Sequence, residues 1–239
     1  MCASDGIIFP GYDYKYKNNN PRDDIILPSV KEQQGKITAS CLKTLVVFVG
    51  GAMDSTFQPL LRPVFAPYEK ENGRDAKDNF DNVTTQRKQD VAYSEHGGGN
   101  VPPLMKEWHA AGQKIVLIGH SWGGDRVILL AQENPDIPIE LLVTLDPVSK
   151  KGKSPKPKNV KQWDNVYIDY SLADGSSANK IARMGGPWEH CPGADNNLAL
   201  NVKLSKDKDG NDIKSLANEY GHAHAARMFS VEKDKIEQI

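Results

Sequence analysis

Four short apolar segments constrain the fold of this chain more than any other feature. They are largely continuous runs rather than alternating patterns, and they lie at residues 45–49, 115–118, 141–145 and 166–170. Strands buried on both faces of a parallel sheet have this pattern, whereas a half-exposed strand alternates apolar and polar residues. We therefore expect these segments to be strands of a parallel sheet that is covered on both faces.

The segments between these runs have helical patterns. Residues 101–113 begin with two prolines and carry Gly112 past the expected helix end, and residues 121–135 place apolar side chains along one face before Pro135. A further short strand is expected at residues 90–93. Strands that alternate with helices predict an α/β fold with a mostly parallel central sheet flanked by helices.

The length and composition fit one domain over residues 1–239. The chain has 239 residues and 38% hydrophobic content, enough to bury one sizeable core. Residues 1–40 read as an N-terminal extension. Residues 54–100 and 171–197 read as irregular stretches and candidate cap or lid insertions, because loops of this length usually carry function or disorder. The lysine-rich and proline-rich residues 150–161 read as a solvated linker.

The charge and cysteine counts exclude several classes of protein. Thirty basic residues against 31 acidic ones give a net charge of −1 and no overall electrostatic reason to expect nucleic acid. Cys2, Cys41 and Cys191 are too few and too scattered for a disulfide framework or a close-spaced zinc site. The N-terminus lacks a basic start followed by an apolar run. We expect a protein that is cytoplasmic, or exported without a cleaved signal peptide, and whose oligomeric state the sequence leaves open.

A serine stands at the junction between the second apolar run and the helix after it. Residues 119–123 read Gly-His-Ser-Trp-Gly and fit G-x-S-x-G directly after a strand and before a helix. Such a turn holds Ser121 in a strained conformation that exposes its hydroxyl. The unpaired N–H groups at the helix start would stabilise an oxyanion, so the Trp122 amide is the expected donor.

A serine nucleophile needs a base, and the base needs a carboxylate that fixes its tautomer. Asp146 follows the third apolar run, at the carboxyl end of a strand, where open α/β sheets gather their functional groups. It is the expected acid. Asp169 and Asp174, around the fourth run, are the alternative acids.

Two histidines near the chain end are candidates for the base. His222 and His224 lie where the chain enters its last expected helix, and either gives the order Ser, Asp, His. His222 follows Gly221 at the turn and can point back over the sheet, whereas His224 is expected inside the first helical turn. His222 is therefore the expected base, and His224 remains the alternative.

From about residue 45 to residue 229, the chain resembles the α/β-hydrolase family, particularly its lipases and esterases. The resemblance rests on the serine turn, on "TLVVFVGGAMDS" and on "TLDPVS", which carries Asp146. It implies that the loop after the first strand supplies a second oxyanion donor, the Ala52 amide. Many members have His-Gly where this chain has Gly50 and Gly51. The "HGGG" of residues 96–99 imitates an esterase oxyanion motif but lies too close to Ser121, so we read residues 96–100 as a loop near the pocket mouth.

The resemblance and the residues together predict an acyl-enzyme serine hydrolase with no metal or organic cofactor. A small-molecule or lipid ester is the expected substrate, with transient contact to a membrane surface. A thioesterase or amidase, a non-catalytic hydrolase-fold binding protein and a secreted bacterial lipase toxin are the alternatives. Six side chains are candidates either for an acyl site or for ordinary core, namely Phe57, Leu60, Leu61, Phe65, Met184 and Trp188.

Overall fold

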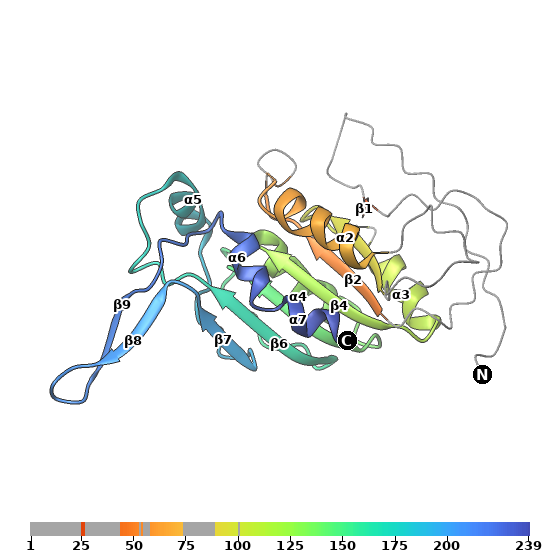
Figure 1. The fold of residues 1–239 in the computed structure, drawn as a ribbon. Coiled ribbons are helices and arrows are strands. Elements are labelled where there is room, and N and C mark those ends of the chain that lie inside the picture. The colour runs from red at the N-terminus through yellow and green to blue at the C-terminus, as the bar shows by residue number, and fades with distance from the viewer. Residues whose placement is uncertain (1–24, 27–43, 53, 55–57, 74–88, 100) are drawn as a thin grey trace.

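The computed structural model describes residues 25–26, 44–52, 54, 58–73, 89–99 and 101–239, and a seven-stranded sheet forms its centre (Figure 1). The strand order is β1-β3-β2-β4-β5-β6-β7. Neighbouring strands are parallel except for β1, which pairs antiparallel with β3. The strands are β1 (Ile25–Ile26), β2 (Thr44–Val49), β3 (Gln89–Ser94), β4 (Lys114–His120), β5 (Ile139–Leu145), β6 (Val160–Tyr167) and β7 (Asn196–Ala199).

Helices cover both faces of this sheet, which confirms the predicted fold class. One apolar cluster joins the sheet to the π-helical turn η2 (Leu61–Phe65), α2 (Ala66–Asn72), α6 (Ala225–Ser230) and α7 (Lys233–Glu237). The other joins it to α3 (Val101–Ala110) and α4 (Trp122–Glu133). Alternate residues of β2 belong to different clusters. Val46 and Phe48 pack in the first cluster, and Leu45 and Val47 pack in the second. Continuous apolar runs are therefore what this sheet requires.

The strand predicted at residues 166–170 is displaced in the structure. β6 starts at Val160, inside the expected linker, and ends at Tyr167. Its buried middle holds Asp164 and Asn165, so it lacks the apolar run of the other central strands. The two side chains are paired, Asp164 with Lys235 and Asn165 with the Thr144 hydroxyl at 2.8 Å. Paired polar groups can be buried in a strand, and a pattern of hydropathy does not detect them.

Residues 171–197 are more regular than expected. They contain α5 (Ser177–Gly185), whose first turn is capped by the Ser176 hydroxyl, and the start of β7. A hairpin of β8 (Val202–Lys206) and β9 (Asp212–Leu216) follows and projects from the body of the molecule (Figure 1). Within residues 54–100, η2 and α2 pack on the sheet and β3 lies in it. A role of these stretches as a cap stays a prediction, and residues 55–57, 74–88 and 100 lie outside the described part.

Candidate active site

The backbone turns sharply at Ser121, between β4 and α4. Ser121 has φ 58° and ψ −125°, a conformation that costs a non-glycine residue about 1–3 kcal/mol. Its N–H donates to the Leu145 carbonyl at 3.1 Å, and its own carbonyl accepts from the Gly124 and Val148 N–H groups at 2.9 and 3.0 Å. The bonds on both sides of the residue hold the strained turn in place.

The glycines of the motif are required by close packing. A Cβ on Gly119 would lie 2.1 Å from the Gly123 carbonyl oxygen, and a Cβ on Gly123 would lie 2.1 Å from the Val49 carbonyl oxygen. Both distances are far inside van der Waals contact. The missing side chains allow α4 to begin directly against β2 and β4, and this close approach fixes where the serine hydroxyl lies.

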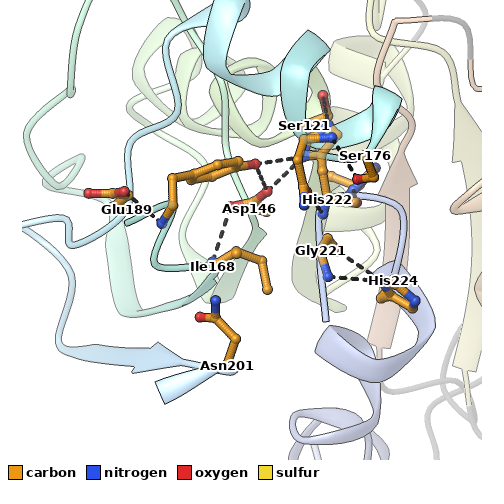
Figure 2. Close-up of polar contacts among 12 residues, drawn as sticks. Ser121, Asp146, Ile168, Ser176, Glu189, Asn201, Gly221, His222 and His224 are labelled. Carbon is orange, nitrogen blue, oxygen red and sulfur yellow. Dashed lines mark hydrogen bonds and ion pairs between the residues drawn. The ribbon is translucent and has the colours of Figure 1, made fainter. Parts of the chain in front are cut away.

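His222 lies between Ser121 and Asp146 (Figure 2). Its Nδ1 is 2.6 Å from Asp146 Oδ2, and its Nε2 is 2.9 Å from Ser121 Oγ. A carboxylate oxygen only accepts, so Nδ1 carries the proton of a neutral ring and Nε2 accepts from the serine hydroxyl. The arrangement is that of a nucleophile, a base and an acid in hydrogen-bonded series.

Asp146 is fully buried at the end of β5 and has a positive φ of 46°. Its backbone N–H donates to the Val166 carbonyl at 2.7 Å. The Ile168 N–H donates to Oδ1 at 3.2 Å, and the Tyr170 hydroxyl donates to Oδ2 at 2.5 Å. Three donors, counting His222, therefore compensate the loss of water around this carboxylate.

Side chains, rather than regular secondary structure, hold the backbone of His222. Its N–H donates to Asn179 Oδ1 at 2.8 Å, and its carbonyl accepts from His120 Nε2 at 2.9 Å. The His120 and His222 rings stack with centroids 4.8 Å apart. Burial, together with the nearby His222, lowers the pKa of His120 to about 3, so this inner ring is neutral. Asn179 and Tyr170 lie outside any local motif, and His120 occupies a variable position of the serine motif, so the sequence did not mark these three residues as functional.

The loop after β2, for which the resemblance implies the Ala52 amide as a second oxyanion donor, runs beside the serine, and the role of Ala52 stays a prediction. A Cβ on Gly51 would lie 2.6 Å from Ser121 Cβ, and Ala52, the next residue, is exposed. Asp54 ties this loop to its surroundings, because its carboxylate accepts hydrogen bonds from the Leu60 N–H at 2.8 Å and from the Tyr93 hydroxyl of β3. Burial raises the pKa of Asp54. On the other side, Trp122 is the first residue of α4, where the N–H has no partner within the helix.

The alternative acids and the alternative base have partners other than Ser121 and His222. Asp169 pairs with Lys214 at 3.2 Å, and Asp174 accepts from Asn179 Nδ2 at 2.6 Å. His224 is the residue before α6 rather than within its first turn, and its Nδ1 accepts from the Gly221 N–H at 2.9 Å.

Exposed apolar side chains lie at the elbow and on α5, whose C-terminal end approaches Trp122. Trp122, Ile181 and Met184 are 42%, 59% and 78% exposed. The Trp122 indole lies close to Gly185 at the end of α5, and its ring packs edge-on against His96 with centroids 5.9 Å apart. The loop of residues 96–99 thus lies beside Trp122.

The other candidates for an acyl site behave differently from Met184. Leu60, Phe65 and Trp188 belong to the buried core, and Leu61 packs against it. For these four residues the core interpretation is correct. Phe57 lies outside the described residues.

Neither a metal cluster nor a membrane helix is found in the described part of the chain. No three histidine, cysteine, aspartate or glutamate side chains of that part are arranged to hold a metal ion. None of its helices is both long enough and apolar enough to cross a bilayer.

The parallel sheet, the helices on its two faces and the serine turn between β4 and α4 define an α/β-hydrolase fold. Among solved structures, the chain is similar to the Bacillus licheniformis lipase BlEst2, with 12% identity, a TM-score of 0.47 and coverage of 91% of this chain and 99% of that chain. A protein described as a predicted CIB-like hydrolase from Thermoplasma acidophilum has 12% identity and a TM-score of 0.42, over 91% of this chain and 99% of its own. The metagenomic carboxyl esterase MGS0156 has 12% identity and a TM-score of 0.37, over 84% and 77%. The sequence matches no protein-family model and no curated protein.

Proposed function

We propose that this protein is a serine hydrolase that cleaves carboxylic esters through Ser121, His222 and Asp146. One observation carries the proposal: His222 lies 2.9 Å from Ser121 Oγ and 2.6 Å from Asp146 Oδ2, at a strained strand-to-helix turn. A glycine-rich turn with an incidental serine would need neither the imidazole nor the buried carboxylate. A binding protein on the same scaffold would not need them either.

The reaction proceeds in two steps. Ser121 Oγ attacks the ester carbonyl carbon while its proton passes to Nε2 of His222, and the Trp122 and Ala52 amides stabilise the oxyanion. When the intermediate collapses, the alcohol leaves with the proton from Nε2, and the acyl group stays on Ser121. Water then gives a proton to Nε2 and attacks the acyl carbon. The acid leaves and the proton returns to Oγ.

A lipid or another acyl ester is the substrate class that the surroundings of the serine favour. Trp122 at the elbow and Ile181 and Met184 on α5, whose end approaches Trp122, are exposed apolar side chains that suit an acyl chain or transient contact with a membrane surface. Thioesters and amides are open to the same triad. Nitrophenyl esters of increasing chain length, assayed beside acyl-thioesters and phospholipids, test this choice. Higher kcat/KM for the longer esters supports the lipid class, and a preference for thioesters or amides contradicts it.

Replacement of the nucleophile tests the mechanism. Ser121→Ala removes the attacking oxygen, and we expect ester hydrolysis to fall about 10⁴-fold or more in a folded protein, with no labelling by a fluorophosphonate probe. Ser205→Ala is the matched control, because Ser205 lies on the exposed β8 strand. Wild-type protein that the probe does not label would favour a non-catalytic binding protein. Activity that survives Ser121→Ala would remove the mechanism.

The alternative of a secreted lipase toxin needs a separate experiment. A lipase toxin that acts outside the cytoplasm should arrest growth when it is directed to the bacterial periplasm, and Ser121→Ala should not. Equal growth of cells that carry the two forms would exclude this role while leaving the ester hydrolase intact.

A further inference from the structure

The acid of the proposed triad has a neighbour that the mechanism does not use. Tyr170 follows β6, and its hydroxyl lies 2.5 Å from Asp146 Oδ2, the same oxygen that accepts from His222 Nδ1 at 2.6 Å. The hydroxyl and Nδ1 are 3.4 Å apart. Two donors thus converge on one carboxylate oxygen, and they compete for the charge that it carries.

The phenol is the donor in this contact. Burial, and then the negative charge of Asp146, raise the pKa of Tyr170 above its usual range, so the hydroxyl keeps its proton. An ionised carboxylate has no proton to give. Hydrogen bonds from a neutral donor to a charged acceptor are short and stronger than those between neutral groups.

The ring is held in place independently of its hydroxyl. The Tyr170 N–H donates to Glu189 Oε1 at 3.0 Å, and its carbonyl accepts from Arg183 at 3.0 Å. The Arg183 guanidinium also lies over the ring, 5.3 Å from its centroid. These contacts involve the backbone and the ring face, so removing the hydroxyl alone leaves both charged neighbours in place.

We propose that Tyr170 is a positioning residue of the active site, whose hydroxyl holds Asp146 and withdraws charge from the oxygen that faces His222. The inference rests on the proposed function. An acid that shares its charge with Tyr170 attracts the Nδ1 proton of His222 less strongly, so the Tyr170 hydroxyl acts on the base through Asp146. The Tyr170 hydroxyl bonds to Asp146 and not to Ser121, so it acts through the acid.

Among the groups around His222, Tyr170 is the neighbour whose hydroxyl shares the charge of Asp146. His222 faces the Asp146 carboxylate, the Tyr170 hydroxyl and the His120 ring, which is neutral because burial lowers its pKa to about 3. Arg183 and Glu189 contact Tyr170 and are retained in a phenylalanine variant. A change in the pH profile of that variant therefore reports the hydroxyl.

The direction of the expected pH shift in Tyr170→Phe follows from the charge of Asp146. In Tyr170→Phe, Asp146 Oδ2 directs its whole charge at His222, which favours the protonated ring. The acid limb of kcat/KM should move up by about half a pH unit or more. The plateau of kcat should fall several-fold because Asp146 loses one of its hydrogen bonds. KM should stay unchanged because the Tyr170 hydroxyl acts through Asp146.

The experiment records kcat/KM for a nitrophenyl ester from pH 5 to 9 in the wild type, Tyr170→Phe and Tyr167→Phe. Tyr167 ends β6, three residues earlier, and its variant also loses a phenol hydroxyl. We expect the acid limb to move for Tyr170→Phe alone. An unmoved limb in folded Tyr170→Phe, or an equal shift in Tyr167→Phe, overturns the proposal.

A second change guards against a variant that does not fold. Site-specific fluorination of the Tyr170 ring next to the hydroxyl makes the phenol a stronger donor, so the limb should move to lower pH. No shift, or a shift to higher pH, overturns the positioning role. Failure of the proposed function itself looks different, because the wild type would then show no ester hydrolysis, or Ser121→Ala would keep the activity, whatever Tyr170 does.

Discussion

Ser121 and His222 come from two parts of the molecule that are built differently. Ser121 and its neighbour Asp146 stand at the ends of central parallel strands, where backbone hydrogen bonds and glycine contacts determine their positions. His222 stands in an irregular segment between β9 and α6, held by the side chains of Asn179 and His120. A change in backbone packing should therefore disable the nucleophile, whereas a change in single side chains should disable the base.

The largest effect is expected at Gly123, on the backbone-packed side. In Gly123→Ala the new Cβ would lie 2.1 Å from the Val49 carbonyl oxygen and push α4 away from β2. We expect a loss of about 3 kcal/mol in the free energy of unfolding, from overpacking against backbone that cannot move aside. Activity should fall about a hundredfold or more in the folded fraction, because Ser121 is displaced. Urea unfolding and ester assays measure the two effects.

Gly99→Ala is the control for this prediction. Its new Cβ would have no heavy atom within 4 Å, and its φ lies outside the positive range. Wild-type stability and activity are expected. Should Gly123→Ala retain both as well, backbone packing would not be what positions the serine.

The next effect concerns the base. Asn179 is buried in α5 and accepts from the His222 N–H at 2.8 Å. In Asn179→Ala this N–H loses its partner, and an unpaired buried donor costs about 1–3 kcal/mol. His222 should lose its fixed position, so kcat is expected to fall about tenfold. KM should remain near the wild-type value, since Asn179 is buried and acts through His222.

Ser177→Ala, at an exposed position of the same helix, should behave as the wild type in both respects. Full activity of a folded Asn179→Ala would mean that His120 alone holds the base. The position of His222 would then depend less on single side chains than its hydrogen bonds indicate.

This contrast also separates what the sequence could predict from what it could not. The serine turn could be predicted because backbone strain and close packing demand glycines at fixed positions around Ser121, which leaves a local pattern. Asp146 could be selected because it follows a buried apolar run. For both residues the signal that marks them, the glycines around Ser121 and the apolar run before Asp146, lies within a few positions of the chain, although most of their hydrogen-bond partners are distant in sequence.

Tyr170, Asn179 and His120 leave no such pattern. Tyr170 reaches Asp146 across 24 positions, and Asn179 reaches His222 across 43. Contacts of this kind depend on the three-dimensional path of the chain, so a sequence pattern cannot distinguish them from ordinary surface residues. The strand predicted at residues 166–170 differs from the observed β6 for a related reason. The buried Asp164 of β6 is paired with Lys235 of the last helix, a contact that the hydropathy pattern does not show.

The smallest effect is expected at Glu232, which directly precedes α7, the last helix after the segment that carries His222. Lys235 pairs with Asp164 of β6 and lies 3.5 Å from Glu232. Burial, and then the neighbouring Asp164, raise the pKa of Glu232 to about 7 from its ordinary 4.5. A folded pKa above the unfolded one means that the folded state binds the proton more tightly. The stabilising contribution is thus complete below about pH 4.5 and lost as the pH rises through about 7.

Between pH 5 and pH 8 the wild type should therefore lose about 2 kcal/mol of unfolding free energy through Glu232, and Glu232→Gln should lose much less. Asp164 does not mask this change: burial raises the pKa of Asp164, but the hydrogen bonds from Lys235 and its other partners outweigh burial and hold the pKa below its ordinary value, outside the pH range of this comparison. Asp234→Asn removes an exposed carboxylate from the same helix and should keep the wild-type slope. Urea unfolding at several pH values measures the slopes. Parallel slopes for the wild type and Glu232→Gln would mean that the docking of α7, and with it the end of the segment that bears the base, does not depend on the protonation of Glu232.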